Sequence, residues 1–447
     1  MAERTWPVVV IGGGAAGLTA ALFAAEGPSR VLLLERTGVV GKKILISGGG
    51  RCNVLPAEAH TGVFETASPR APLETVLAAW PLAEQARFFE RDLGVRLKHE
   101  AFDTTVAPPY PGVRMTSRFG APGKLFPVSN RAAEVRDALL AACQRRGVEV
   151  RLNVSLAGLA WDTQRDAWRL DLGAWQAGKR QGETAPPRAG GALFARRVVL
   201  ATGGLSVPAT GSDGAGLRLA ESLGLTAAPT YPALTPLLGG SAEHHDLAGV
   251  SLLVTLTASQ PALRVSGGFL FTHRGYSGPA VLDVSHVAAR RQGGDRPAIH
   301  VAWSEHTAEA WTTALVSAPG TALAVLRERL PERLARALLS EAGLPETRRA
   351  AELPRADRRR LVELLTRYPL PWTGDEGYRK AEVTGGGVRL DEVNLATLES
   401  RAWPGLYLCG EMLDVFGPIG GYNFLWAWAS GRVAGSASGG GGVGTPP

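Results

Sequence analysis

Cysteines are scarce in this sequence, and long apolar runs are absent from it. Cys52, Cys143 and Cys409 are the three cysteines in 447 residues, too few and too scattered for a disulfide framework or a zinc site. No window reaches the roughly eighteen uninterrupted apolar residues of a membrane-spanning helix. No charged and then apolar segment resembles a signal peptide, because the apolar residues 8–11 are followed at once by glycines. These absences predict a protein of the reducing cytoplasm.

Acidic residues are the minority among the charged side chains. The formal net charge is +7, from 48 Lys and Arg against 41 Asp and Glu, and six of the basic residues are lysines. The arginines are densest at Arg348, Arg349, Arg355, Arg358, Arg359 and Arg360. Such a run on a helix is usually a solvated face, and a nucleic-acid surface is the alternative that a basic balance invites. We expect a small-molecule substrate, with neither nucleic acid nor membrane as a partner.

The start of the chain has a pattern typical of dinucleotide-binding proteins. Residues 8–11 are β-branched and predict a buried strand, after which Gly12, Gly14 and Gly17 fall in the order G-x-G-x-x-G. The first glycine permits a tight turn, the second lets the backbone approach a pyrophosphate, and the third lets the helix pack closely. A helix predicted at about 15–25 directs its free N–H groups at the phosphates.

A second predicted strand, at 31–34, ends at Glu35. A carboxylate about twenty positions after the glycine turn accepts hydrogen bonds from an adenosine ribose in such folds. A lone G-x-G-x-x-G is weak evidence, whereas strand, turn, helix, strand and acid in this order form the full fingerprint. The fingerprint leaves open whether the dinucleotide is NAD or FAD.

The next part of the chain predicts a parallel sheet with an antiparallel insert. Helices are expected at 72–89 and 131–146, and strands at 148–156, 167–172 and 193–199. The loop at 178–191 has no core-forming residues. Dinucleotide-binding flavoproteins insert such a β-meander, whereas an NAD dehydrogenase continues its βαβ alternation.

The pattern changes after residue 205. Short strands are expected at 250–256, 269–271, 281–284 and 299–303, which favours a small antiparallel sheet or barrel. Residues 307–367 are predicted to be helical, with breaks at Pro319, Pro331, Gly343 and Pro354. From Ser436 the tail is rich in glycine and is expected to form no core.

A second chemically informative stretch covers residues 405–431. A predicted strand runs into a turn at Gly410 and Glu411, and the pair Gly420-Gly421 opens a helix. A helix start presents N–H groups and a positive dipole end, which suits the anionic N1–C2 edge of a reduced flavin. Asp414 is placed to bind a polyol chain such as ribitol.

Six motifs of the chain occur together in one protein family. The most specific is the run from Gly41-Lys42-Lys43 to Gly49-Gly50-Arg51-Cys52-Asn53. The others are the turn at 12–17 and the runs at 125–130, 201–204, 271–279 and 410–423. With these motifs the chain resembles the HI0933-like group of two-dinucleotide-fold FAD oxidoreductases, and the resemblance spans residues 8–435. It implies amine oxidation or reduction of an activated alkene, and the sequence does not choose between the two.

The resemblance implies an α/β fold in which both chain ends form one Rossmann-like FAD-binding domain. A β-barrel domain and a small helical domain are inserted into it. The implied segments are 1–205 for the first part of the FAD-binding domain, 206–305 for the barrel, 306–367 for the helical insertion, 368–382 for a return strand of the barrel, 383–435 for the second part of the FAD-binding domain and 436–447 for a disordered tail.

The resemblance also implies which residues bind the FAD, which is held without a covalent bond and without a metal. The turn at 12–17 would hold the pyrophosphate, Glu35 the ribose, and the backbone near Leu156 the adenine. Tyr422, placed next to the flavin ring, is the candidate for catalysis. The implied cofactor-binding set is Gly12, Gly14, Ala15, Ala16, Gly17, Glu35, Arg36, Lys43, Ser47, Gly49, Gly50, Arg51, Cys52, Asn53, Leu156, Ala201, Thr202, Gly203, Gly410, Glu411, Asp414, Gly420, Gly421, Tyr422 and Asn423.

Several other side chains have two interpretations each. Cys52 has no second cysteine two or three positions away, which favours packing beside the flavin over redox chemistry. The pair His244-His245 lacks further ligands at metal-site spacing, which favours a loop. His273 and Tyr276 either face the flavin or stabilise a turn.

The predicted activity is that of an FAD-dependent oxidoreductase that passes a hydride through flavin N5 between a small organic substrate and NAD(P)H or oxygen. One G-x-G-x-x-G follows a strand, so NAD(P)H would dock transiently at the flavin. The alternatives are an RNA-associated flavoprotein and an NAD-dependent dehydrogenase without flavin. The physiological substrate and the oligomeric state are not predicted.

Overall fold

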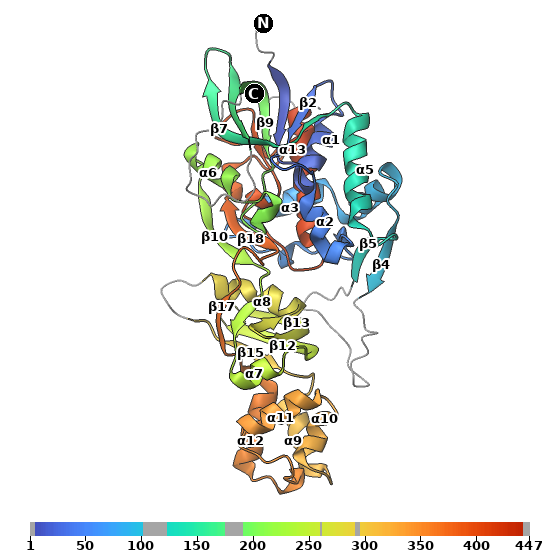
Figure 1. Ribbon diagram of the computed structural model, residues 1–447, viewed down its shortest axis with the longest axis vertical. Helices are drawn as coiled ribbons and strands as arrows, with labels where there is room; N and C mark the ends of the chain where they lie inside the picture. The colour runs from blue at the N-terminus through green and yellow to red at the C-terminus, as the bar shows by residue number, and fades with distance from the viewer. Residues whose placement is uncertain (1–4, 102–122, 175–190, 260–261, 291–295, 441–447) are drawn as a thin grey trace. The chain divides into compact units, whose positions relative to one another are not determined.

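The computed structural model describes residues 5–101, 123–174, 191–259, 262–290 and 296–440 (Figure 1). The chain divides into two compact units. Unit 1 comprises Met1–Glu100, Gly123–Thr230 and Val383–Pro447, and unit 2 comprises Ala101–Pro122 and Tyr231–Glu382. The loop predicted at 178–191 lies almost wholly outside the described residues. Within the described ranges, every helix is too short or too polar to cross a bilayer.

Unit 1 contains a seven-stranded sheet that joins both ends of the chain. Its strands are β1 Trp6–Ile11, β2 Val31–Leu34, β6 Glu149–Arg151, β7 Val154–Asp162, β8 Ala167–Ala174, β9 Ala192–Leu200 and β19 Leu406–Leu408. The order is β6-β2-β1-β9-β8-β7, with β19 paired to β9. β6, β2, β1, β9 and β19 run parallel, whereas β7 and β8 are antiparallel. The predicted meander within a parallel sheet is confirmed.

Two helices from opposite ends of the chain pack directly on each other in unit 1. They are α1 (Ala15–Ala24) and α13 (Tyr422–Gly439), drawn in blue and red in Figure 1. A Cβ at Gly431 would lie 2.5 Å from the carbonyl oxygen of Ala16, and one at Gly435 would overlap the carbonyl oxygen of Ala20. Gly439 meets α1 one turn further along. Glycine at every fourth position therefore lets the two backbones touch.

The predicted start of the tail at Ser436 is wrong. The helix α13 continues to Gly439, and Ser438 is fully buried. A glycine-rich composition led to the prediction of disorder. In the structure, however, the glycine spacing matches the helical repeat and provides the contact surface with α1. Residues 441–447 lie outside the described part of the chain.

Two further elements of unit 1 differ from the prediction. The helix expected at 72–89 is broken after Trp80, because Pro81 has no N–H to donate and the residue before a proline avoids the helical region. The strand expected at 148–156 is interrupted at Asn153, whose φ of +58° turns the chain between β6 and β7. The other α-helices in the described part of unit 1 are α2 Lys42–Ile46, α3 Arg70–Ala79, α4 Leu82–Arg87, α5 Ala132–Arg145 and α6 Ala215–Ser222, and a π-helix at Phe88–Asp92 follows α4.

Two small sheets complete the strands of unit 1. One consists of β3 (Leu55–Pro56), β5 (Gly123–Pro127) and β4 (Leu97–Ala101). The other is a two-stranded ribbon of β10 (Ala227–Ala233) and β18 (Val383–Val388). Two of the points at which the chain passes between units 1 and 2 are Tyr231 within β10 and Val383, where β18 begins. The β10–β18 ribbon is therefore a covalent connection between the two units.

Unit 2 contains a seven-stranded antiparallel sheet. Its order is β16 Tyr368–Pro369, β15 Ile299–Ala302, β12 Ser251–Ser259, β13 Ala262–Thr272, β14 Gly275–Ser277, β11 Leu237–Gly239 and β17 Trp372–Asp375. Alternate residues of β12 and β13 are buried, as expected for strands with one face on a core. Among the described residues this strand order does not return to its start, so closure into a barrel stays a prediction.

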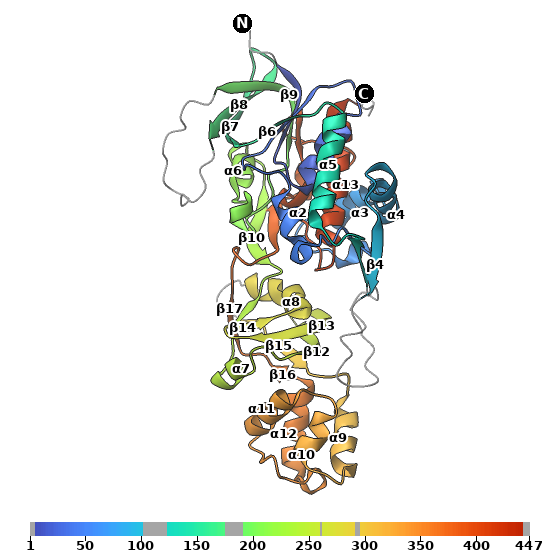
Figure 2. The ribbon, with the colours of Figure 1, turned by 45° about the vertical axis from the view of Figure 1, so that its right-hand side comes forward.

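The prediction of a strand at 281–284 is wrong, because these residues belong to the helix α8 (Pro279–Ala289). Gly278 adopts φ +96°, and Pro279 then occupies the first helical position, where its missing N–H costs nothing. Val281, Val284 and Val287 fall on one helical face and are buried. α8 packs against β13 (Figure 2). The short stretch Val281-Leu282-Asp283-Val284 is compatible with either a strand or a helix, because its periodicity is ambiguous.

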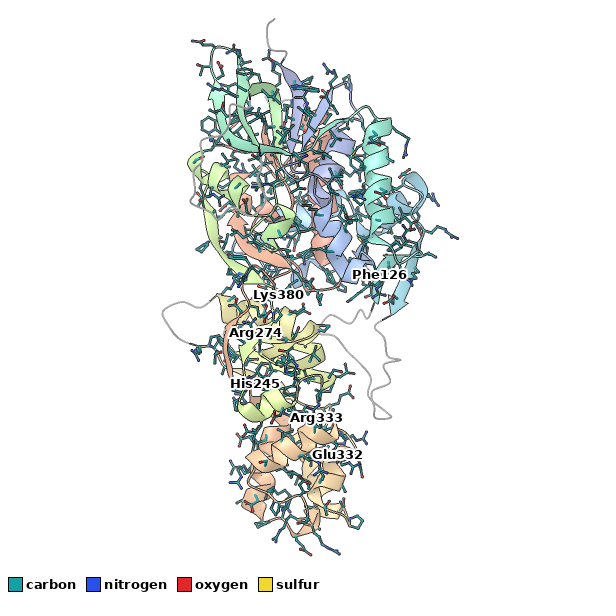
Figure 3. The ribbon with its side chains drawn as sticks, in the orientation of Figure 1. Phe126, His245, Arg274, Glu332, Arg333 and Lys380 are labelled. Atoms are coloured by element: carbon teal, nitrogen blue, oxygen red, sulfur yellow. The ribbon has the colours of Figure 1, made fainter. Side chains whose placement is uncertain are left out.

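The helices predicted between 307 and 367 are present in unit 2. They are α9 Ala308–Ser317, α10 Ala322–Arg327, α11 Glu332–Glu341 and α12 Arg355–Thr366, preceded in the chain by the short α7 Ala242–Asp246. The side chains of Thr307 and Thr321 cap α9 and α10. Arg333 of α11, labelled in Figure 3, donates to the carbonyl oxygen of Asp246 at the end of α7. The finer domain boundaries at 205, 305, 367 and 382 stay predictions.

The contact between α1 and α13 gives a first prediction. Gly435→Ala should destabilise the protein by about 2–4 kcal/mol, because the new methyl group overlaps backbone rather than a flexible side chain. Gly62→Ala is the matched control, since a Cβ there has no neighbour within 4 Å. Urea unfolding followed by circular dichroism measures both. Equal stability of the two variants would contradict the backbone contact.

Candidate cofactor site

The glycine turn after β1 has the geometry expected of a phosphate-binding loop. Gly12 adopts φ +104°, and a Cβ on it would overlap the carbonyl oxygen of Ala201. A Cβ on Gly17 would overlap the carbonyl oxygen of Gly12, whereas one on Gly14 has nothing within 4 Å. The first and third glycines are thus required by packing, and the second faces open space. α1 starts there without a side-chain cap and without an acid in its first turn, which leaves its amides for an anion.

Glu35 stabilises this turn. Its Oε2 accepts from the Gly13 amide at 2.8 Å, its Oε1 accepts from the Thr37 amide at 2.7 Å, and the residue is 7% exposed. Each carboxylate oxygen still has a second lone pair for a ribose hydroxyl. The amide of Val154 donates to the Glu35 carbonyl at 3.0 Å, which brings the strand that contains Leu156 alongside. Arg36, by contrast, pairs with Asp213 at 2.5 Å.

The loop from Gly41 to Asn53 depends on glycine for its shape. The amide of Gly41 donates to the Gly13 carbonyl at 2.7 Å and so fixes the loop to the glycine turn. Gly48, Gly49 and Gly50 adopt φ of +56°, +67° and +85° in succession, a region that other residues occupy only at a cost. All three are exposed. This loop therefore presents backbone rather than side chains to its surroundings.

The side chains that end this loop have different environments. Arg51 donates from Nη1 to both carboxylate oxygens of Glu100 at 3.0 and 2.9 Å, and its guanidinium lies 4.3 Å from the ring centre of Phe126. Burial raises the pKa of Cys52 to about 12, so the thiol stays protonated. Asn53 is 8% exposed, and its buried Oδ1 has no hydrogen-bond partner within the described ranges. Asn53 is thus ready to accept from a ligand.

The carboxyl end of β9 contains a second buried side-chain oxygen without a hydrogen-bond partner in the described ranges. The Ala201 amide donates to the Ile11 carbonyl at 2.9 Å, which extends the sheet to the edge of the site. Thr202 has a buried Oγ1 that lacks a partner in the described part of the chain. Gly203 adopts φ +72°, and a Cβ there would overlap Ser212 Oγ. β9 therefore ends next to the glycine turn, and the contacts of Ala201, Thr202 and Gly203 to FAD stay predictions.

The C-terminal half of the site comes from β19 and the segment that follows it. Gly410 adopts φ +75°, and its amide donates to Ser430 Oγ at 3.0 Å. Glu411 Oε2 lies 2.6 Å from Lys43 Nζ, so a residue from each end of the chain forms an ion pair. Gly421 adopts φ +99° and opens α13 without a side-chain cap or an acid in the first turn. Like the start of α1, this second helix start has no side-chain cap.

Three side chains of this half serve the protein itself. Asp414 is 1% exposed, and its Oδ2 accepts from the amides of Ala67 and Ser68 at 2.8 and 3.0 Å. Burial raises the pKa of Asp414, and the hydrogen bonds oppose that rise. Asn423 exchanges two hydrogen bonds of 2.9 Å with the backbone of Gly417. Tyr422 donates from its hydroxyl to the Glu58 carbonyl at 3.0 Å.

These contacts test whether the chain suits an FAD. Two uncapped helix starts and an open Gly14 fit the phosphates of an anionic dinucleotide, and the partnerless Oδ1 of Asn53 fits one of its N–H or O–H groups. Arg51, Asp414 and Asn423 use their hydrogen bonds within the protein, so their predicted contacts to FAD stay predictions. Sequence reasoning missed Ser68, Ser206 and Thr384, which hold Asp414 and Glu411. No local motif marks these three residues.

The candidate side chains of unit 2 lie in a different environment. His244 is 2% exposed, with Nδ1 2.7 Å from the Tyr276 hydroxyl and Nε2 3.0 Å from the Tyr368 hydroxyl. Burial raises the pKa of both tyrosines above its usual range. Tyr276 is fully buried in the core of unit 2, whereas His273 is exposed in the turn after β13. No group of three His, Cys, Asp or Glu side chains in the described ranges is arranged to hold a metal.

The fold and the site of unit 1 define a dinucleotide-binding α/β protein. The chain belongs to the HI0933-like family: the family model for the HI0933-like protein Rossmann domain matches residues 6–105 and 112–437. This is a family of FAD-dependent oxidoreductases, as the sequence motifs implied. Membership argues against an NAD-dependent dehydrogenase without flavin.

Curated relatives match nearly the whole chain. The ribosomal RNA dihydrouridine synthase of Escherichia coli (strain K12) is 32% identical over 427 residues, which cover 94% of this chain and 95% of the relative. The 3-dehydro-bile acid delta(4,6)-reductase of Clostridium scindens is 31% identical over 441 residues, or 96% and 98% of the two chains. The solved structure of a 3-ketosteroid delta1-dehydrogenase from Sterolibacterium denitrificans is 14% identical in sequence, and the match covers 98% of this chain and 100% of that chain. Its TM-score is 0.49.

The environment of the thiols gives a second prediction. Burial raises the pKa of Cys52, Cys143 and Cys409 to about 12 each. At pH 8 only roughly one thiol in ten thousand is then the reactive thiolate. Native protein should react with Ellman's reagent far more slowly than urea-unfolded protein, in which all three thiols titrate. Rapid reaction of Cys52 in the native protein, identified by its loss in Cys52→Ala, would count against a purely packing role.

Proposed function

We propose that this protein is an FAD-dependent reductase that adds a hydride to an activated carbon–carbon double bond, with NAD(P)H as the electron source. Bound FAD would supply the hydride from its N5. Both relatives named above support this direction, because one is named a reductase and the other a dihydrouridine synthase. Oxidation of a small amine with oxygen as the acceptor is the alternative that the motifs leave open.

The residues of unit 1 have defined parts in this proposal. The amides at the start of α1 bind the pyrophosphate, and Glu35 binds the adenosine ribose while it holds the Gly13 amide. The glycines at 48–50 let the backbone lie against the flavin, with Asn53 Oδ1 as an acceptor. The uncapped start of α13 at Gly421 stabilises negative charge at the pyrimidine edge when the flavin is reduced. The observation that carries the proposal is the pair of uncapped helix starts at this one site.

The third prediction concerns the electron donor. Purified protein should be yellow, release FAD on denaturation, and lose its visible absorbance when mixed with NADH or NADPH without oxygen. A small amine should leave the absorbance unchanged. Bleaching by the amine but not by either nicotinamide would favour the oxidase. A colourless protein that releases no FAD would refute the whole proposal.

An RNA substrate is the second candidate, although the sequence led us to expect no nucleic-acid partner. The relative named as a ribosomal RNA dihydrouridine synthase is 32% identical over nearly the full chain. Arg349, Arg355 and Arg359 are exposed and form no ion pair within the described part of the chain. Arginines of this kind are available to phosphates. The activated double bond would then belong to a base of the RNA.

The fourth prediction tests RNA binding by its dependence on salt. The slope of log affinity against log salt is negative, by about 0.7 for each contact to a single-stranded phosphate. If Arg355 and Arg359 each make such a contact, the double change to Glu should reduce the magnitude of this slope by about 1.4. Arg165→Glu is the control, since this exposed arginine already pairs with Asp162 in unit 1. Retention that does not change between low and high salt in the unmodified protein would eliminate the RNA candidate.

A further inference from the structure

A cluster of four polar residues joins distant segments of unit 1. It consists of Lys43, Ser206, Thr384 and Glu411. Lys43 Nζ donates to Ser206 Oγ at 2.6 Å and to Glu411 Oε2 at 2.6 Å. Ser206 Oγ in turn donates to Glu411 Oε1 at 2.5 Å. The ammonium of the 41–53 loop is therefore held by a carboxylate from the far end of the chain.

Thr384 connects this cluster to β18. Its amide donates to Glu411 Oε1 at 3.0 Å, and its Oγ1 accepts from the amides of Leu205 and Ser206 at 2.7 and 3.2 Å. Ser206 is fully buried and Thr384 is 1% exposed. One oxygen of Glu411 thus holds the loop, and the other holds a strand.

The strand β18 has little freedom to move independently of this cluster. Every residue from Val383 to Val388 is buried. A Cβ on Gly386 would overlap the carbonyl oxygen of Pro229 in β10, and one on Gly387 would lie 2.6 Å from the carbonyl oxygen of Met412. At its other end, the Asp414 amide donates to the Val388 carbonyl at 2.8 Å. Both ends of β18 are therefore bonded to the 411–414 segment.

We propose that Glu411 is a positioning residue that links binding of FAD at the 41–53 loop to the stiffness of the β10–β18 ribbon. The inference rests on the proposed function in taking FAD as the ligand. When FAD orders the exposed Gly48–Gly50 backbone, it restrains Lys43 in the same loop. Lys43 then restrains Glu411 through their ion pair, and Glu411 restrains the Thr384 amide through its other carboxylate oxygen. Because coupling between two sites is reciprocal, a looser ribbon lowers the affinity for FAD by the same factor. The ribbon contains Tyr231 and Val383, two of the points at which the chain passes between units 1 and 2.

The test compares hydrogen exchange in the full chain with and without saturating FAD. In the unmodified protein, FAD should slow exchange of the β18 amides by at least about fivefold, the low end of ordinary coupling. In Glu411→Gln at saturating FAD, the slowing should fall below about twofold. Glu399→Gln is the matched control, because this carboxylate holds the Gly405 amide at 2.7 Å outside the cluster and should leave the response intact.

A second variant covers the case in which Glu411→Gln does not fold. Lys43→Met removes the cation from the loop but leaves Glu411 bonded to Ser206 and Thr384, and it should abolish the response of β18 in the same way. Undiminished slowing in either variant would overturn the linkage. A protein that retains FAD without any change in β18 would overturn the linkage alone, whereas failure to bind FAD would overturn the proposed function and the linkage together.

Discussion

The contact of α1 with α13 is the constraint on which the rest of unit 1 depends. The two helices come from opposite ends of the chain, and their backbones meet at Gly431, Gly435 and Gly439. Dispersion contacts weaken steeply with distance. A side chain at these positions would push the two helices apart and so weaken the contacts along their whole length. Their packing brings the turn at Gly12 and the start of α13 into one site. Neither half has a complete cofactor site without this contact.

In the proposed FAD site, recognition would depend more on backbone than on side chains. Glu35, Asp414 and Asn423 use their strongest hydrogen bonds to hold neighbouring loops in place. The groups that the proposal assigns to the ligand are mainly amides, at two helix starts and in a loop of left-handed glycines, together with Asn53 Oδ1 and the second lone pairs of the Glu35 carboxylate. Such amides are held rigidly by the helices and the sheet, and they present partial positive charge without a mobile cation. A site of this kind suits a cofactor that must be bound in the same place in every redox state.

The sequence predicted those features whose cause is local. The turn at 12–17, the strand at 31–34 and the helix breaks between 307 and 367 depend on residues a few positions apart, and the structure shows all of them. The errors arose where a local pattern has two physical solutions. The valines of α8 have the composition of a strand, but Pro279 starts a helix. The glycine-rich stretch from Ser436 resembles a disordered tail, yet α13 continues to Gly439, which meets Ala24 of α1.

The sequence alone thus determined the dinucleotide fingerprint, the family and the two glycine-rich segments that build the site. Only the tertiary structure decided which polar side chains meet. Lys43 and Glu411 are 368 positions apart, and Ser68 and Asp414 are 346 positions apart. A buried or half-buried polar group needs a partner wherever the fold places it, and any of several donors or acceptors can serve. Short-range sequence patterns do not predict which of these partners meet, because the pairing depends on how the sheet packs and how α1 packs on α13.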